Sequence, residues 1–273
     1  MSDLTTELKL LAHHIGTPAL AAKAARNLFN KMSALADEHR NEQERERGIH
    51  PSQLAYCLRA AAMELNEMPR FRAQQPEALK QAGMTGSARH AMHQSNFVRA
   101  AQVDGSFAFT PEVKICRSDP DASRLALAGS SDGVFKIGSV RMGLEIKTLS
   151  GRDFKSLKDT PRERDMLQAS VYQHCLELDG MWFMYESRET FQVRHIPLKI
   201  SEKYWEEMER RAEAVMGAEL LDMMPIGLPS AMSCRMCSYE PICPQPRNEP
   251  VPKEKVYLCL KTQNDQKQRA GSS

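Results

Sequence analysis

The stretch from Leu127 to Thr148 constrains the fold most, because apolar and polar residues alternate along it on both sides of a short turn signal. Alternation with a period of two is the pattern of a strand with two different faces. Gly138 and Ser139 suit a two-residue type II′ turn, in which glycine takes the first central position. The stretch is therefore predicted to form a β-hairpin in which Ile137 pairs with Val140.

Counting outward from that turn assigns the side chains to two faces. One face is apolar and is predicted to join the core; it carries Phe135, Ile137, Val140, Met142, Leu144 and Ile146. The other face is mostly charged; it carries Asp132, Val134, Lys136, Arg141, Glu145 and Lys147.

This register places the two acids of the charged face, Asp132 and Glu145, directly opposite each other. Directly opposed residues have Cβ atoms about 4.5–5.5 Å apart. Two carboxylates at that distance repel, which favours a raised pKa or a bound cation, and Mg²⁺ or Mn²⁺ takes oxygen ligands. Lys147 shares the face and could activate a water molecule or stabilise charge on a phosphate. A surface hairpin with ordinary polar residues facing outward is the alternative.

The composition indicates an ordinary globular protein, with 273 residues, 41% of them hydrophobic and 26% charged. The net charge of +2 is too small to indicate nucleic-acid binding, so any DNA affinity has to come from a local basic groove. No apolar run is long enough to span a membrane and no signal-peptide pattern is present, so the protein is expected to be cytoplasmic. The chain has no phosphate-binding G-x-x-x-x-G-K-[ST] loop, and therefore no obvious ATPase motor.

Periodicity divides the chain into helical and strand-like segments. Helices are predicted over residues 4–47, from Ser52 as N-cap to about 66, and over 77–103, 160–178 and 201–221. Strands are predicted within 107–148 and at 181–187 and 190–198. A Lys-rich tail follows from about residue 250, in which the sequence VYLCL could add an edge strand.

Other polar residues are candidates for chemistry. His90 ends a G-x-x-x-H motif on a predicted helix, and an imidazole can join carboxylates on Mn²⁺ or Mg²⁺. Gln168 and Tyr172 share a helix face at i and i+4 and could hydrogen-bond DNA. Lys136 and Arg141, on the charged hairpin face, are further candidate DNA contacts. Each of these motifs taken alone also fits a plain surface or core residue.

The seven cysteines favour metal binding over disulfides, because the chain shows no export signal. Cys234, Cys237 and Cys243 have the spacing C-x₂-C-x₅-C, and three thiolates in so short a loop indicate a cluster or a zinc site. Cys57 is the candidate for a fourth ligand, and Cys259 is the alternative. The spacing by itself does not separate zinc from iron–sulfur.

The order of these motifs resembles the RecB-type branch of the PD-(D/E)XK nucleases. The matching motifs are Cys57, G-x-x-x-H at His90, G-x-x-D at Asp132, E-x-K at Glu145 and Lys147, Q-x-x-x-Y at Gln168 and Tyr172, and the three late cysteines. The likeness is to the iron–sulfur subgroup, which includes CRISPR-adaptation nucleases, the AddB nuclease domain and related phage exonucleases. It covers roughly residues 50–245.

The resemblance implies an α/β fold with a restriction-endonuclease-like core, a central mixed sheet flanked by helices. It also implies a [4Fe–4S] cluster, with Zn²⁺ as the alternative, that joins the N- and C-terminal parts through Cys57, Cys234, Cys237 and Cys243. The domain would span residues 48–245, between a helical segment at 1–47 and a basic tail at 246–273.

The resemblance also implies roles for the site residues. His90, Asp132 and Glu145 would bind the catalytic Mg²⁺ or Mn²⁺ with the carbonyl of Ile146, and Lys147 would be the catalytic lysine. Gln168 and Tyr172 would line the path of the DNA strand.

The expected function is that of a metal-dependent DNA exonuclease acting from single-stranded ends in recombination, repair or phage DNA processing. A structure-specific or flap endonuclease of the same fold is one alternative, and a non-catalytic iron–sulfur DNA-end-binding assembly factor is another. The absence of a fused motor leaves room for a helicase or recombinase in a separate chain. The segment at 1–47 and the basic tail are candidates for oligomerisation or partner contacts.

Overall fold

The computed structural model describes residues 47–71, 77–115, 119–220, 223–227, 234, 237–246 and 248–271. The chain divides into two units between residues 46 and 47, and all of the described residues belong to the second unit. The helix predicted over residues 4–47 lies outside them, apart from Arg47. None of the helices among the described residues is long and apolar enough to cross a lipid bilayer.

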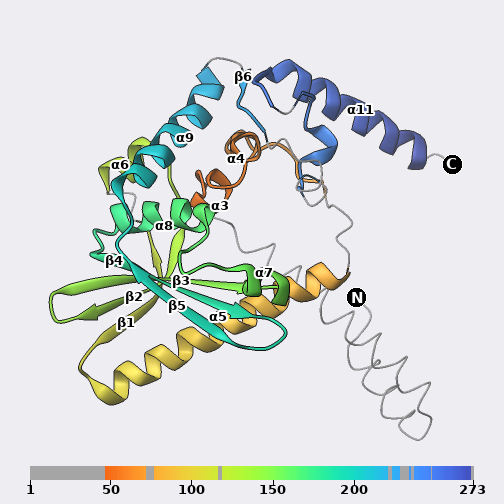
Figure 1. Ribbon diagram of the computed structural model, residues 1–273. Coiled ribbons are helices and arrows are strands. Elements are labelled where there is room, and N and C mark those ends of the chain that lie inside the picture. Colours follow the sequence, from red (N-terminus) through yellow and green to blue (C-terminus); the bar gives the residue numbers. More distant parts are fainter. Residues whose placement is uncertain are drawn as a thin grey trace, which may run out of the picture. The chain divides into compact units, whose positions relative to one another are not determined.

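A mixed five-stranded sheet forms the centre of this unit (Figure 1). Its strands are β1 (Ala108–Lys114), β2 (Ser130–Ile137), β3 (Val140–Leu149), β4 (Gly180–Ser187) and β5 (Val193–Leu198), and they lie in that order. The β3–β4 pair is parallel and the other three pairs are antiparallel. The predicted central mixed sheet is thus confirmed.

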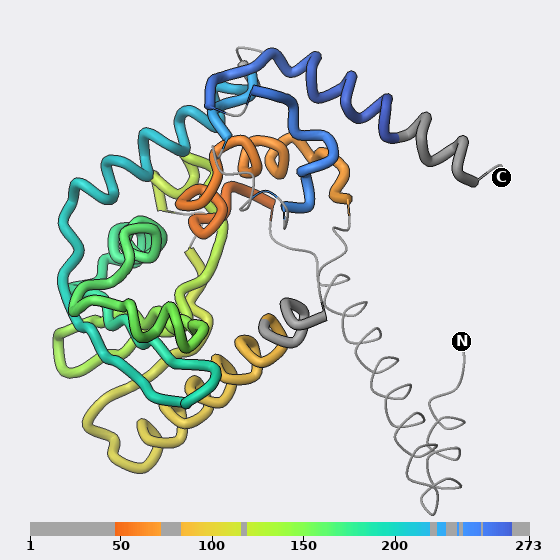
Figure 2. The backbone as a smooth tube through the Cα atoms, turned by 45° about the vertical axis from the view of Figure 1, so that its right-hand side comes forward, coloured from red at the N-terminus to blue at the C-terminus, as the bar shows by residue number. Residues whose placement is uncertain are grey.

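Helices cover both faces of the sheet. α5 (Glu77–Asp104) lies against one face, and α8 (Glu163–Cys175) lies against the other, with α9 (Glu202–Leu220) packed on α8 (Figure 1 and Figure 2). The short helices α6 (Pro120–Arg124) and α7 (Gly151–Ser156) lie in the connections before β2 and after β3. Since both faces are covered, polar residues in the middle of the strands are buried and need partners.

An aromatic cluster fixes α5 to the sheet. The Phe97 ring of α5 lies 5.4 Å from Phe109, 5.1 Å from Phe135 and 5.6 Å from Trp182, measured between ring centroids. The Phe97–Phe135 pair is edge-to-face, at an interplanar angle of 80°. Pairs of this kind contribute about 0.5–1.5 kcal/mol beyond the apolar area they bury.

The hairpin turn is as predicted, but its tip is not part of the core. Gly138 has φ 61°, Ser139 does not share this left-handed conformation, and Ile137 pairs with Val140, as a type II′ turn requires. Phe135, Leu144 and Ile146 are buried on the α5 side, as expected. Ile137 and Val140 were wrongly assigned to the core, because they are 53% and 44% exposed. The hairpin continues beyond the residues that pack beneath α5.

The helix expected to start at Ser52 is two helices. α3 (Pro51–Leu54) has His50 as its N-cap, and α4 (Leu58–Leu65) begins after Cys57, whose φ of −148° and ψ of 112° are extended. The chain therefore turns between the two helices at residues 55–57.

The region predicted as a basic tail is also structured. β6 (Met223–Met224) pairs with β7 (Val251–Pro252), and α11 (Lys253–Gly271) follows directly. The predicted edge strand VYLCL is wrong, because these residues lie in α11. Val256 is fully buried while Tyr257 and Leu258 are more than half exposed, which is a helical and not an alternating pattern.

One arginine connects α4 to the C-terminal part of the chain. Arg59 is 0% exposed, and its guanidinium donates hydrogen bonds to four backbone carbonyls. The acceptors are Pro225, Pro244, Pro246 and Glu249, at 2.7–3.2 Å. Within the described ranges Arg59 forms no ion pair with a carboxylate, so these carbonyls replace water around a buried cation.

We predict that Arg59→Met lowers the free energy of unfolding by about 3–5 kcal/mol, because it removes a buried charged donor and leaves its acceptors unpaired. Urea denaturation measures the change. Arg210→Met is the matched control, since the Arg210 side chain is 67% exposed and should change stability by less than about 0.5 kcal/mol. Equal stability of the two variants would contradict the role given to Arg59.

Candidate active site

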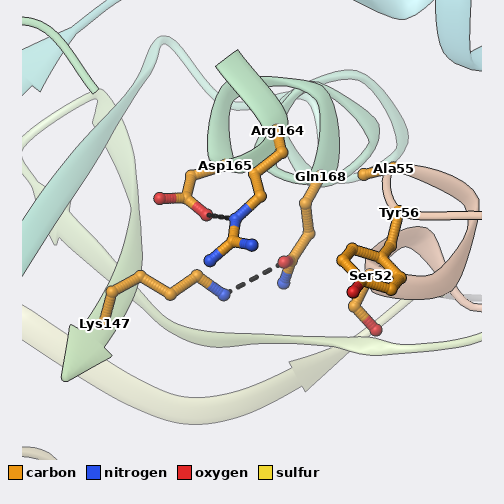
Figure 3. Close-up of a pocket in the computed structure, with 7 residues that line it drawn as sticks. All are labelled: Ser52, Ala55, Tyr56, Lys147, Arg164, Asp165 and Gln168. Carbon is orange, nitrogen blue, oxygen red and sulfur yellow. Dashed lines mark hydrogen bonds and ion pairs between the residues drawn. The ribbon is translucent and has the colours of Figure 1, made fainter. Parts of the chain in front are cut away.

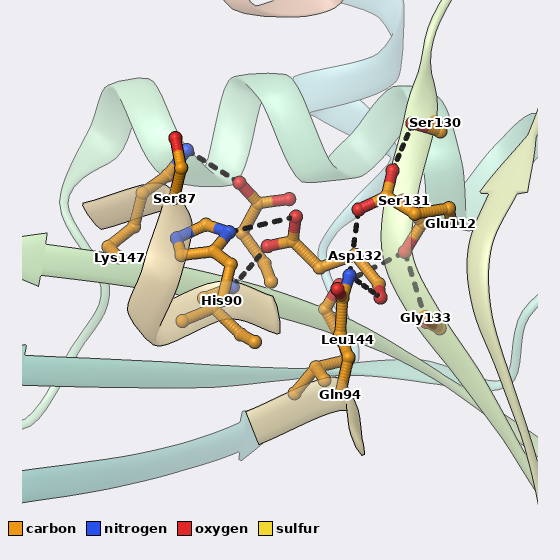
Figure 4. Close-up of polar contacts among 12 residues, drawn as sticks. Ser87, His90, Gln94, Glu112, Ser130, Ser131, Asp132, Gly133, Leu144 and Lys147 are labelled. Carbon is orange, nitrogen blue, oxygen red and sulfur yellow. Dashed lines mark hydrogen bonds and ion pairs between the residues drawn. The ribbon is translucent and has the colours of Figure 1, made fainter. Parts of the chain in front are cut away.

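The ladder between β2 and β3 ends where the acids begin. The paired residues run from Ile137 and Val140 to Gly133 and Leu144, which confirms the predicted register up to the residues beside Asp132 and Glu145. Beyond that pair the two strands form no further ladder pairs. His90 of α5 reaches this point, with its Nδ1 atom 3.4 Å from Asp132 Oδ1 (Figure 4).

Asp132 is held by backbone and side-chain contacts. Its Oδ2 atom accepts a hydrogen bond from the Ile146 amide at 2.6 Å, and its carbonyl accepts one from Gln94 Nε2 at 2.8 Å (Figure 4). Gln94 also donates to Glu112 at 2.7 Å. Glu112 has φ 50°, a left-handed conformation that costs about 1–2 kcal/mol for a residue with a Cβ atom. This strain interrupts the β1–β2 pairing beside Asp132.

Glu145 forms a closed set of contacts with Lys147 and Gln168. Its side chain is 2% exposed, and its Oε1 atom lies 2.6 Å from Lys147 Nζ. Gln168 of α8 donates from Nε2 to the same oxygen at 2.9 Å and accepts from Lys147 Nζ at 3.0 Å through its Oε1 atom. The helix therefore fixes the acid and the lysine of β3 relative to each other.

The electrostatics of these groups are coupled. Burial raises the pKa of Glu145 against the opposing charge of Lys147, and the nearby Asp132 carboxylate raises it further. Burial would lower the pKa of Lys147, but the Glu145 carboxylate holds that pKa above its usual value. For His90, burial lowers the pKa, while the hydrogen bond and charge of Asp132 raise it by more. The site concentrates negative charge and has a single ammonium within it.

Among the described residues, no three His, Cys, Asp or Glu side chains surround one point closely enough to hold a metal ion as they stand. His90 and Asp132 face each other, whereas the Glu145 oxygen is directed to Lys147 and Gln168. The donor set of two carboxylates and an imidazole suits a hard divalent cation. To bind a metal ion together with His90 and Asp132, the Glu145 side chain would have to change its torsion angles.

The predicted DNA contacts fall into two groups. Gln168 reaches the site, and the Tyr172 hydroxyl lies beside Gln168 and near Glu145, but the Tyr172 side chain is only 4% exposed. Lys136 is exposed and Arg141 half-buried near the hairpin tip, four or more positions from the acids along the strands. Four residues of extended chain span about 13 Å, so these two side chains are separate from the site.

The cysteine set comes together from two parts of the chain. The Cys237 amide donates to the Cys234 carbonyl at 2.9 Å, which forms a tight turn. Burial raises the pKa of Cys237, and Cys57, Cys243 and Cys234 are each near enough to Cys237 to raise that pKa further. Arg59 Nη1 lies 3.8 Å from Cys243 Sγ, which adds a buried cation beside the thiols. As these described side chains stand, no three of them surround one point closely enough to hold a metal ion, although their residue type suits one.

Two buried acids beside the site were missed from the sequence. Asp165 accepts hydrogen bonds from Arg162 Nε at 2.7 Å and Tyr185 Oη at 2.9 Å. Glu186 of β4 accepts from His93 at 2.7 Å and pairs with Arg89, both on α5. The only sequence signal was an acid inside a strand or at a helix start, which is common on surfaces.

No family model matches the chain, and no curated protein matches it. Two solved structures are similar over most of their lengths. "Crystal structure of SSO0001" is 18% identical, with a TM-score of 0.47, covering 76% of this chain and 91% of that one. An alkaline exonuclease (LHK-Exo) from Laribacter hongkongensis is 15% identical, with a TM-score of 0.34, covering 62% and 89%. The activity therefore has to be inferred from the site's own geometry.

We predict that Glu186→Gln loosens α5, because the neutral amide cannot pair with Arg89 and replaces a charge-assisted contact with His93. The free energy of unfolding should fall by about 1–3 kcal/mol, and amide hydrogen exchange should speed up in α5 more than in β4. Glu207→Gln is the matched control, since Glu207 pairs with Arg210 and Arg211 on α9. Unchanged protection of α5 would show that Glu186 does not hold it.

Proposed function

We propose that this chain is a metal-dependent deoxyribonuclease of the RecB-type PD-(D/E)XK class, with a restriction-endonuclease-like core. The observation that carries the proposal is the Glu145–Lys147–Gln168 set, which lies beside Asp132 where the β2–β3 ladder ends. A buried acid and a lysine that are both held by the Gln168 side-chain amide suit phosphodiester cleavage better than a purely structural role in the core. A structural hairpin gains nothing from burying Glu145 and Lys147 together.

Each residue has a role in the proposal. Asp132, Glu145 and His90 would hold Mg²⁺ or Mn²⁺ with the Ile146 carbonyl, and the ion when bound would supply Lewis-acid stabilisation of the phosphate oxygens. The Lys147 ammonium would donate hydrogen bonds to the scissile phosphate and offset the negative charge that develops on its oxygens. Gln168 keeps the Lys147 ammonium in place, and the Ile146 amide keeps Asp132 in place.

The preference for single-stranded DNA ends rests on the order of the motifs. A structure-specific or flap endonuclease and a non-catalytic iron–sulfur DNA-end-binding factor are the alternatives. The pairing of Glu145 with Lys147 favours an enzyme over the binding factor, because DNA binding alone does not need a buried acid beside the lysine.

We further propose that Cys57, Cys234, Cys237 and Cys243 hold a [4Fe–4S] cluster, with Zn²⁺ as the alternative. The four thiols are close enough for their charges to interact, and Arg59 lies beside Cys243. The group would join α4 to the loop before β7 and so support the core without taking part in the reaction.

We predict that the wild-type protein digests linear, end-labelled single-stranded DNA with Mn²⁺ and leaves covalently closed circles intact. Lys147→Ala should bind the same DNA but cut it roughly 10²–10³-fold more slowly, because the ammonium beside the phosphate is lost. Lys199→Ala, at an exposed position after β5, is the control and should cut normally.

The other outcomes of this experiment separate the alternatives. Rapid digestion of circles would establish the endonuclease reading, and binding without cleavage by the wild type would establish the non-catalytic one. Full activity of Lys147→Ala would remove the lysine from the reaction.

We predict that anaerobically purified protein contains iron and sulfide and absorbs visible light, and that Cys57→Ser and Cys237→Ser lose both. Cys259→Ser is the matched control, because Cys259 lies on α11 and should keep the cluster. Iron analysis and the absorption spectrum measure the outcome. Zinc in place of iron would select the other metal, and retention of iron by Cys57→Ser with loss in Cys259→Ser would exchange the fourth ligand.

A further inference from the structure

A polar cavity of about 160 Å³ adjoins the Glu145–Lys147–Gln168 set. Its lining comes from β3, α8 and the α3 region and consists of Ser52, Ala55, Tyr56, Lys147, Arg164, Asp165 and Gln168. Figure 3 shows the Arg164 guanidinium pointing down from α8 toward Lys147 and Gln168, with Tyr56 on the opposite wall. Two cations thus meet in one small cavity next to the proposed scissile phosphate.

The donors of Arg164 are left largely open. Its contact with Asp165 is long, at 3.6 Å from Nε to Oδ1. The other oxygen of Asp165 is taken by Arg162 and Tyr185. In the part of the chain that the structure describes, the two terminal nitrogens of Arg164 form no hydrogen bond, although its side chain is only 53% exposed. A planar guanidinium with a free pair of donors is suited to a phosphate.

Arg164 also belongs to a second cavity. This one has a volume of about 620 Å³ and runs along the segment between α7 and α8, lined by Asp153, Ser156, Leu157, Lys158, Thr160, Pro161, Arg162, Glu163 and Arg164. Arg164 is the residue that the two cavities share. Lys158 and Arg162 add positive charge beyond it, whereas Asp153 and Glu163 add negative charge and Arg162 is paired with Asp165. The positive charge that a phosphate can meet along this cavity therefore comes mainly from Arg164 and Lys158.

We propose that Arg164 binds the phosphate next to the one at Lys147, and that a single nucleic-acid strand leaves the site over residues 156–164. This inference rests on the proposed nuclease function and assigns a second phosphate position to it. Tyr56, 41% exposed on the opposite wall, offers a face on which a base of that strand can stack.

The test uses Lys147→Ala as the background, so that DNA is bound and not consumed. Single-stranded oligonucleotides carry one uncharged methylphosphonate linkage, moved one position at a time. Adding Arg164→Ala should weaken binding of unmodified DNA about tenfold and lower the salt slope by about 0.7, which is one phosphate contact on a single strand. One methylphosphonate position should weaken binding with Arg164 present and have no effect without it.

Matched variants separate charge from structure. Arg164→Lys should recover part of the affinity but not the full effect of a two-pronged donor. Arg210→Ala removes the same charge from the exposed side of α9 and should leave both affinity and salt slope unchanged. Urea denaturation should show the Arg164→Ala protein to be as stable as its background, because the Asp165 contact is long.

The failures are distinguishable. If the wild type cuts DNA and Arg164→Ala binds with unchanged affinity and salt slope, the second phosphate position is wrong and the nuclease function stands. If every methylphosphonate position affects both backgrounds equally, Arg164 does not contact a particular phosphate and the inference is overturned. If the wild type binds no nucleic acid at all, both proposals fall.

Discussion

The site depends on one buried carboxylate. An acid that is 2% exposed, as Glu145 is, costs several kcal/mol to ionise away from water unless charge and hydrogen bonds compensate. Lys147 supplies the charge from the same strand face, and Gln168 supplies the hydrogen bond from α8. The compensation exists only when α8 is packed on β3, so the interaction ties the fold to the chemistry. Another buried acid, Glu186, has a similar role on the opposite face, where its contacts with Arg89 and His93 hold α5 and thereby His90.

The C-terminal part of the chain also depends on a buried charge that protein groups compensate, in this case a positive one. Arg59 is a buried cation whose partners are carbonyls and the Cys243 sulfur. Carbonyl dipoles solvate such a charge only partly, so an anionic group at the neighbouring thiols would be stabilised by it. Arg59 of α4 thus ties together the described residues that follow β6 and precede β7, next to the Cys243 sulfur.

Local patterns were enough to predict the hairpin and the nearness of Asp132, Glu145 and Lys147 on it. Alternation around Gly138 fixed the register, and the register brought Asp132 toward Glu145. The features that the sequence did not predict depend largely on contacts between residues far apart in the chain. Arginine is almost never fully buried, so Arg59 reads as a surface residue, and its acceptors lie 166 to 190 positions away. The turn at residues 55–57 has no glycine or proline to mark it. The segment around Val256 has the composition of a strand, but it forms part of α11, in which Val256 is buried and Tyr257 and Leu258 are exposed.

The turn between α3 and α4 contributes residues both to the cavity beside Lys147 and to the cysteine set. Tyr56 lines the cavity beside Lys147, and the next residue, Cys57, belongs to the cysteine set and is the N-cap of α4. Tyr56 lies in the turn itself and Cys57 after it has an extended backbone, so one short segment contributes to both the cavity and the cysteine set. A metal or cluster on Cys57 would thus restrain the wall of the cavity through a single peptide bond. The cysteine set would in this way affect the shape of the cavity without lining it.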